Sequence, residues 1–139
     1  MILSAKLFVF NEKEEVLVLR RSKTHPTNPH CTDLPGGLIE SHEYEVAAAL
    51  RELQEETALT ADENTCELFY ATTVPLPSGN SLTMLMYKIH FDNTPDVTIS
   101  WEHESYEWCS IAELLDRQDL DQPERTGVEY ALKQGLFTT

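Results

Sequence analysis

Three glutamates lie close together just after Arg51. Glu52, Glu55 and Glu56 have i, i+3 and i+4 spacing, which on an α-helix puts them on one face. Like charges this close destabilise a helix by about 0.2–0.5 kcal/mol per pair, so a bound cation would relieve them. Magnesium prefers carboxylate oxygens and keeps positions for water and phosphate. The triplet therefore fits a magnesium site, although by itself it is more typical of a solvated acidic face.

The residues around the triplet favour the metal site. The turn Pro35-Gly36-Gly37 precedes the helix, and its glycines allow backbone carbonyls to approach a ligand. Arg51 stands beside the acidic cluster, where its guanidinium can hold a carboxylate in place.

The stretch from Gly37 to Leu59 resembles the Nudix box, which reads G, five residues, E, seven residues, R-E-U-x-E-E-x-G-U, where U is a bulky aliphatic residue. Eight positions match in type and spacing: Gly37, Glu43, Arg51, Glu52, Leu53, Glu55, Glu56 and Leu59. Ala58 stands where the family has glycine. Because that position follows the helix, we expect Ala58 to alter stability more than chemistry. The resemblance continues at Leu34–Gly37, Val16–Arg21 and Glu102–Trp108.

This resemblance implies a fold and an activity. The fold is an α/β/α sandwich around a mixed β-sheet. The activity is hydrolysis of the diphosphate linkage in a nucleoside diphosphate linked to another moiety, by metal-assisted attack of water. The cofactor is Mg²⁺, with Mn²⁺ as an alternative, and the partner is a small nucleotide: a nucleoside triphosphate, nucleotide sugar, ADP-ribose or dinucleoside polyphosphate.

Two other functions are compatible with parts of the sequence. A Nudix-like module could sense a nucleotide without cleaving it, but such modules usually lose box glutamates that this chain has. A structural or interaction domain with an incidental acidic helix would not explain why Gly37 and Arg51 stand in register with those glutamates.

The resemblance also assigns roles to residues of the box. Glu55 and Glu56 are the principal metal ligands, and the carbonyl of Gly36 is an additional candidate ligand. Glu52 is either a further ligand or the general base, and because family members differ on which glutamate is the base, Glu55 stays a catalytic candidate too. The orienting residues are Glu43 and Arg51.

Four candidates lie outside the box. Glu102 matches the place of a further ligand or base in several family members, but it also fits an ordinary surface glutamate. Arg20 and Arg21 end a predicted strand, where one can bind phosphate. His103 could contact substrate or be a surface residue.

Three aromatic residues could stack on a nucleobase. They are Phe8, Tyr87 and Trp101. Each alternates like a core or sheet residue, so we predict that they are core, as we do for Met84 and Met86.

The elements that must position these residues follow from the hydrophobic pattern. Strands are predicted at Leu3–Phe10, Val16–Leu19, Leu68–Val74, Leu82–Phe91 and Glu107–Cys109, with the first two forming a hairpin and Ser22–Gly37 a long irregular loop. Helices are predicted at Ser41–Thr57 with Ser41 as N-cap, from Ser110 with Glu113 completing a capping box, and at Glu124–Leu136.

Length and charge limit the class of protein. The 139 residues fit one domain, 1–139. A net charge of -14 disfavours binding to nucleic acid polymers or anionic membranes. No apolar run approaches the roughly 20 residues of a membrane helix, so a cytoplasmic protein is expected. Cys31, Cys66 and Cys109 form no metal or disulfide pattern and are expected to be reduced; a homodimer is compatible with the sequence.

Overall fold

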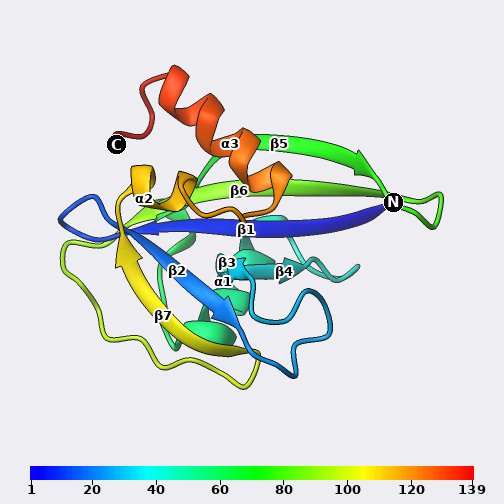
Figure 1. Ribbon diagram of the computed structural model, residues 1–139, viewed down its shortest axis with the longest axis horizontal. Coiled ribbons are helices and arrows are strands. Elements are labelled where there is room, and N and C mark those ends of the chain that lie inside the picture. The colour runs from blue at the N-terminus through cyan, green and yellow to red at the C-terminus, as the bar shows by residue number, and fades with distance from the viewer.

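A computed structural model describes residues 1–139 and shows a mixed seven-stranded sheet with helices on both faces (Figure 1). The strands are β1 (Ile2–Phe10), β2 (Val16–Arg21), β3 (Thr32–Asp33), β4 (Gly36–Leu38), β5 (Glu67–Pro75), β6 (Ser81–His90) and β7 (His103–Cys109). The helices are α1 (Glu45–Thr57), the 3-10 helix η1 (Glu63–Thr65), α2 (Ile111–Leu115) and α3 (Gln122–Lys133). The strand order is β3-β2-β1-β6-β5, with β4 paired to β1 and β7 paired to β2.

Strand β1 is the centre of this sheet. It runs parallel to β6 along its whole length, from Ile2 opposite Leu82 to Phe10 opposite His90. Its other edge is shared: β4 pairs antiparallel with residues 4–6, and β2 pairs at Phe10 opposite Val16. Because Lys6 is the register partner of Gly36, the glycine turn before α1 is held against the middle of the protein.

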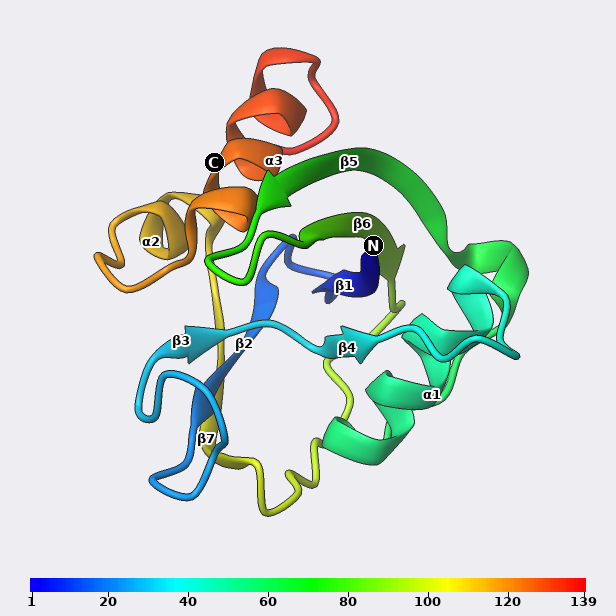
Figure 2. The ribbon, with the colours of Figure 1, turned by 90° about the vertical axis from the view of Figure 1, so that its right-hand side faces the viewer.

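The hydrophobic core lies in two layers on either side of the sheet. Alternate residues of β1 point to opposite faces, as strand geometry requires. Phe8 and Phe10 pack toward α2 and α3, and Leu7 and Val9 pack toward α1. Figure 2 shows α1 and α3 on opposite sides of the strands. The predicted α/β/α sandwich around a mixed sheet is confirmed.

Several element boundaries differ from prediction. The Ser22–Gly37 loop ends in the short strands β3 and β4, which pair with β2 and β1 far away in sequence and so leave no local pattern. β7 begins at His103 rather than Glu107. The helix α1 begins at Glu45, with Tyr44 at the N-cap and no side-chain capping bond. Ser41 instead lies in the turn that carries Glu43 toward Arg51.

The predictions that particular aromatic residues and methionines are core residues are correct except at Trp101. Phe8 and Tyr87 are buried, as are Met84 and Met86, which confirms those predictions. Trp101 was wrongly predicted as core, because its side chain is 67% exposed in the turn before β7.

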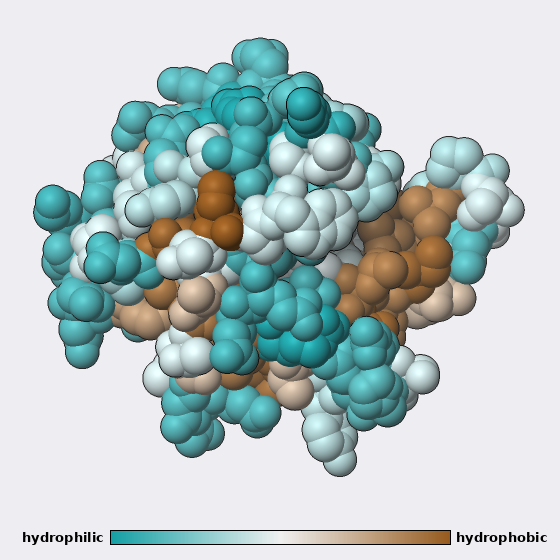
Figure 3. Space-filling model, turned by 90° about the horizontal axis from the view of Figure 1, so that it is seen from below, coloured by the Kyte–Doolittle hydropathy of each residue, from teal (hydrophilic) through white to brown (hydrophobic).

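The face of the molecule seen in Figure 3 carries mainly hydrophilic side chains, and hydrophobic groups gather toward its right-hand edge. None of the helices has the length and apolar character needed to cross a bilayer.

The C-terminus of α1 carries a strained residue. Ala58 has φ 63° and ψ 12°, and its N–H donates to the carbonyl of Gln54 at 2.9 Å. In this left-handed conformation the Cβ of a non-glycine residue lies too close to the neighbouring backbone, and the steric strain costs about 1–2 kcal/mol.

We therefore expect Ala58→Gly to raise the free energy of unfolding by about 1 kcal/mol, because the relief of strain exceeds the added entropy of the unfolded chain. Urea denaturation measures the change. Ala47→Gly, inside the same helix, is the matched control and is expected to lower stability by about 1 kcal/mol. Equal losses in both variants would contradict strain at Ala58.

Helix α3 buries a carboxylate. Glu124 is 1% exposed, and its Oε1 has no hydrogen-bond partner. Burial raises the pKa of Glu124 to about 7, against the opposing effect of Lys6. The folded protein therefore holds this proton more tightly than the unfolded chain, so stability falls as pH rises from about 4.5 to about 7.

Glu124→Gln removes that ionisation, so we expect the variant to gain stability relative to the native protein between pH 5 and pH 8, by about 2–3 kcal/mol. Denaturant unfolding at both pH values measures the difference. Glu129→Gln, at an exposed site on the same helix, serves as the control, and a Glu124→Gln difference no larger than that of the control contradicts the expectation.

Candidate active site

Arg51 contacts acidic side chains from α1 and from the turn before it. Its guanidinium makes a two-bond contact with Glu43, with Nε donating to Oε2 at 2.6 Å and Nη2 to Oε1 at 3.0 Å. Nη1 donates to Oε1 of Glu52 at 3.0 Å and to Oε2 of Glu55 at 3.2 Å. The hydrogen bonds from Arg51 hold the pKa of Glu43 at about 2. One cation thus offsets the mutual repulsion of three carboxylates and fixes their orientation.

Glu56 is the buried member of the acidic group. Its side chain is 2% exposed, and Oε1 accepts the backbone N–H of Gly36 at 2.8 Å. Burial raises the pKa of Glu56 to about 8, while Lys6 and the Gly36 N–H oppose the rise. Its Oε2 accepts no hydrogen bond from the protein and is not fully buried, so it is open to a ligand. Burial disfavours the ionised form of Glu56, and a divalent cation beside Oε2 would favour that form, so the donor set fits a hard metal ion.

The two glycines before α1 are required by close contacts. Gly36 has φ +144°, and a Cβ there would lie 2.0 Å from the carbonyl oxygen of Ala5. A Cβ on Gly37 would lie 2.7 Å from the carboxyl carbon of Glu52. Because both positions lack a side chain, the backbone of β4 lies directly against Glu52 and Glu56.

Glu52 is a half-buried member of the acidic group. Burial raises the pKa of Glu52 against the opposing charge of Arg51, and the negative charges of Glu55 and Glu102 add to the rise. The segment that leads to Glu102 is bonded to the end of α1, where the N–H of Thr98 donates to the carbonyl of Thr57 at 3.0 Å.

A second cluster of charged residues surrounds Asp33. Its carboxylate contacts Lys6 Nζ at 2.8 Å, Arg21 Nε at 3.2 Å and His103 Nε2 at 2.9 Å. Burial opposes ionisation, but Lys6, His103 and Arg21 together hold the pKa of Asp33 well below its ordinary value. Lys6 also donates to the carbonyl of Leu34 at 3.1 Å.

Ligand atoms of His25, Asp33 and His103 lie within 4.8 Å of one another, which is close enough for a shared metal ion. The charges argue against one. Lys6 and Arg21 already contact both carboxylate oxygens, and two buried cations would repel a third. This group is better explained as an ion-pair cluster that joins strands.

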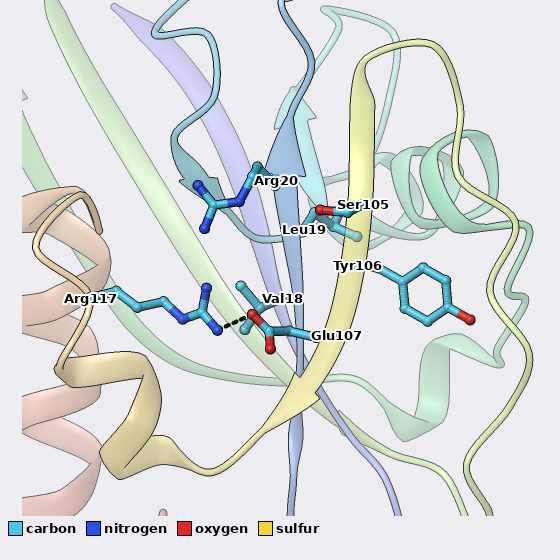
Figure 4. Close-up of a pocket in the computed structure, with 7 residues that line it drawn as sticks. All are labelled: Val18, Leu19, Arg20, Ser105, Tyr106, Glu107 and Arg117. Carbon is cyan, nitrogen blue, oxygen red and sulfur yellow. Dashed lines mark hydrogen bonds and ion pairs between the residues drawn. The ribbon is translucent and has the colours of Figure 1, made fainter.

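Arg20 and Arg21 point to opposite faces of the sheet. Arg21 is buried in the Asp33 cluster, and its Nη1 donates to the carbonyl of Thr27 at 3.1 Å. Arg20 faces a groove of about 270 Å³ beside Arg117 (Figure 4). Its Nη1 donates to the carbonyl of His30 at 2.7 Å. The two arginines therefore do not share one pocket, and phosphate binding by either stays a prediction.

The structure differs most from the sequence predictions at Glu102 and His103, where β7 begins. His103 is 3% exposed and bonded to Asp33, so it is neither a surface nor a loop residue. Glu102 is partly exposed, and its Oε2 lies 3.8 Å from Nε2 of His25. Sequence reasoning missed His25, Lys6 and Asp33. Only the rarity of a buried lysine within the apolar run of β1 could have indicated the last two.

The chain has relatives among known proteins. The sequence matches the NUDIX domain family over residues 2–130. The chain belongs to this family. An asymmetrical bis(5'-nucleosyl)-tetraphosphatase from Caenorhabditis elegans is 30% identical over 108 residues, which are 77% of this chain and 75% of that protein.

Solved structures of this family are similar throughout the chain. A MutT protein from Methanosarcina mazei Go1 has a TM-score of 0.82 at 28% identity, covering 96% of this chain and 94% of the other. A C. elegans Ap4A hydrolase in a binary complex has a TM-score of 0.74 at 22% identity, covering 97% and 99%. At that identity the second structure supports the fold alone.

The Asp33 cluster gives a stability prediction. Asp33→Asn leaves Lys6 and Arg21 buried without their anion, so we expect a loss of about 3–5 kcal/mol in the free energy of unfolding. Urea denaturation at neutral pH measures it. Glu67→Gln, which breaks the exposed pair with Lys88, is the control and is expected to change stability by less than about 1 kcal/mol. Similar small effects in both variants would show that the cluster adds little stability.

Proposed function

We propose that this NUDIX protein is a magnesium-dependent hydrolase that cleaves the diphosphate linkage of a nucleoside diphosphate joined to another moiety. The observation that carries the proposal is the arrangement of Glu56, which is buried against the N–H of Gly36 with one oxygen lacking a partner, beside two carboxylates that Arg51 orients. This is a preformed place for a cation and an anionic substrate in a protein of net charge -14.

The residues that would hold Mg²⁺ are Glu55, Glu56 and Glu102, together with the carbonyl of Gly36, and Glu52 would be a further ligand only if it is not the general base. When bound, the ion supplies neutralisation of the phosphate oxygens, which is the main requirement of such transfer to water.

The chain's own residues have distinct parts in this proposal. Arg51 keeps Glu43 and Glu52 in fixed orientations, and Gly37 lets Glu52 lie against β4. The Glu52 side chain is 15% exposed and held by Arg51, whereas that of Glu55 is 55% exposed. We therefore assign the general base, which must hold a constant position toward water, to Glu52 rather than Glu55.

For the substrate, a dinucleoside tetraphosphate is the first compound to test. The C. elegans relative, described as a tetraphosphatase, is 30% identical over most of both chains. Nucleoside triphosphates, nucleotide sugars and ADP-ribose complete the panel, because nothing in the box distinguishes them.

The test is hydrolysis of this panel with Mg²⁺ or Mn²⁺. We expect turnover of at least one compound, its loss on chelation of the metal, and a fall of about 100-fold or more in Glu56→Gln, because a lost ligand exceeds the 10–100-fold effect of a residue behind a ligand. Glu45→Gln, at an exposed position in the first turn of α1, is the control and should keep full activity.

Two results would contradict the proposal. Full activity in Glu56→Gln would remove that residue from the metal site. If no compound turned over while one raised the melting temperature, the protein would be a nucleotide sensor, and quenching of the exposed Trp101 would report its binding.

A further inference from the structure

The side chain of His25, in the loop between β2 and β3, is buried against the protein. The residues on either side of His25 are exposed, from Lys23 to Thr24 and from Pro26 to His30. The His25 side chain itself is 9% exposed. Its ring lies 5.9 Å from the ring of His103 at an angle of 56°. A polar loop has no hydrophobic reason to bury one imidazole, so the contacts of that imidazole are informative.

The turn that carries His25 is fixed to the segment that carries Glu102. The hydroxyl of Ser22 donates to the carbonyl of Trp101 at 2.8 Å, and the N–H of Ser22 donates to the carbonyl of Glu102 at 2.9 Å. The N–H of His25 then donates to the carbonyl of Ser22 at 3.2 Å. The turn and Glu102 therefore form one unit, although about 80 residues separate them in the chain.

The hydrogen bonds also define the state of the imidazole. Nδ1 of His25 accepts the backbone N–H of Thr27 at 3.1 Å, so the ring hydrogen is on Nε2. Nε2 lies 3.8 Å from Oε2 of Glu102. This exceeds the usual upper limit of about 3.2 Å for a hydrogen bond, so a direct hydrogen bond requires the two side chains to move closer together.

We propose that His25 is a positioning residue of the active site, whose Nε2–H directs the Glu102 carboxylate toward the glutamates of α1. This inference rests on the proposed function, in which Glu102 is a metal ligand. The segment that leads to Glu102 is bonded to the end of α1, where the N–H of Thr98 donates to the carbonyl of Thr57 at 3.0 Å. His25 acts through Glu102 and does not itself touch metal or substrate.

The test is a double-mutant cycle with two readouts: Mn²⁺ binding without substrate, followed by electron paramagnetic resonance, and hydrolysis of the best substrate with Mn²⁺. We expect His25→Ala to weaken Mn²⁺ binding and lower kcat by about 10-fold each, as for residues that orient metal ligands. In a Glu102→Ala background it should have no further effect. His25→Gln, which keeps an N–H near the position of Nε2, should recover most of the loss.

His30→Ala is the matched control. His30 lies in the same loop and pairs with a glutamate of β7, Glu104, at 2.6 Å, but on an exposed surface. We expect it to keep both Mn²⁺ binding and kcat. Melting temperatures of all variants separate loss of fold from loss of position.

The outcomes are distinguishable. An equal effect of His25→Ala with and without Glu102, or no effect on Mn²⁺ binding, would overturn the proposal. So would unchanged Mn²⁺ binding in Glu102→Ala. If the native protein cleaved none of the panel, the proposed function would fail, but the Mn²⁺ binding cycle would still decide the role of His25.

Discussion

The buried carboxylate of Asp33 joins four strands at one point. From β3 it contacts Lys6 of β1, Arg21 of β2 and His103 of β7. The four strands come from separate parts of the chain, and the cluster fixes their positions relative to one another. We call these strands with their cluster the Asp33 platform. A buried charge of this kind does not favour stability over an apolar core, but removal of one partner is costly. Its effect is to define which arrangement of the strands is allowed.

Both sides of the candidate site are built on that platform. Asp33 is followed directly by Leu34, Pro35 and Gly36, and Gly36 then holds Glu56 through its N–H. His103 follows Glu102 directly, so the same carboxylate also anchors the segment that carries Glu102. A shift of Asp33 would therefore move the backbone on one side of the site and a candidate ligand on the other.

The glutamates of α1 show how the protein tolerates acidic residues that repel one another. Arg51 shares its guanidinium among Glu43, Glu52 and Glu55, while Glu56 lies buried where Lys6 and the Gly36 N–H partly offset its charge. Carboxylates that are already held in place would favour the binding of the proposed cation, because little ordering is then left to the binding step.

The sequence by itself determined the box and the general architecture. Arg51 and the three glutamates lie within one helix, where spacing alone dictates which side chains share a face, and Gly37 stands a fixed number of residues before them. The alternating and apolar runs similarly predicted β1, β2, β5 and β6 within a few residues.

Only the tertiary structure decided the rest. The strands β3 and β4, the burial of His103 and the meeting of Asp33 with Lys6 all depend on pairings between distant segments. His25 likewise meets Glu102 only because Ser22 bonds to the turn before β7. Local periodicity carries no record of such contacts, because a pair of charges far apart in sequence becomes a cluster only when the sheet that brings them together has formed.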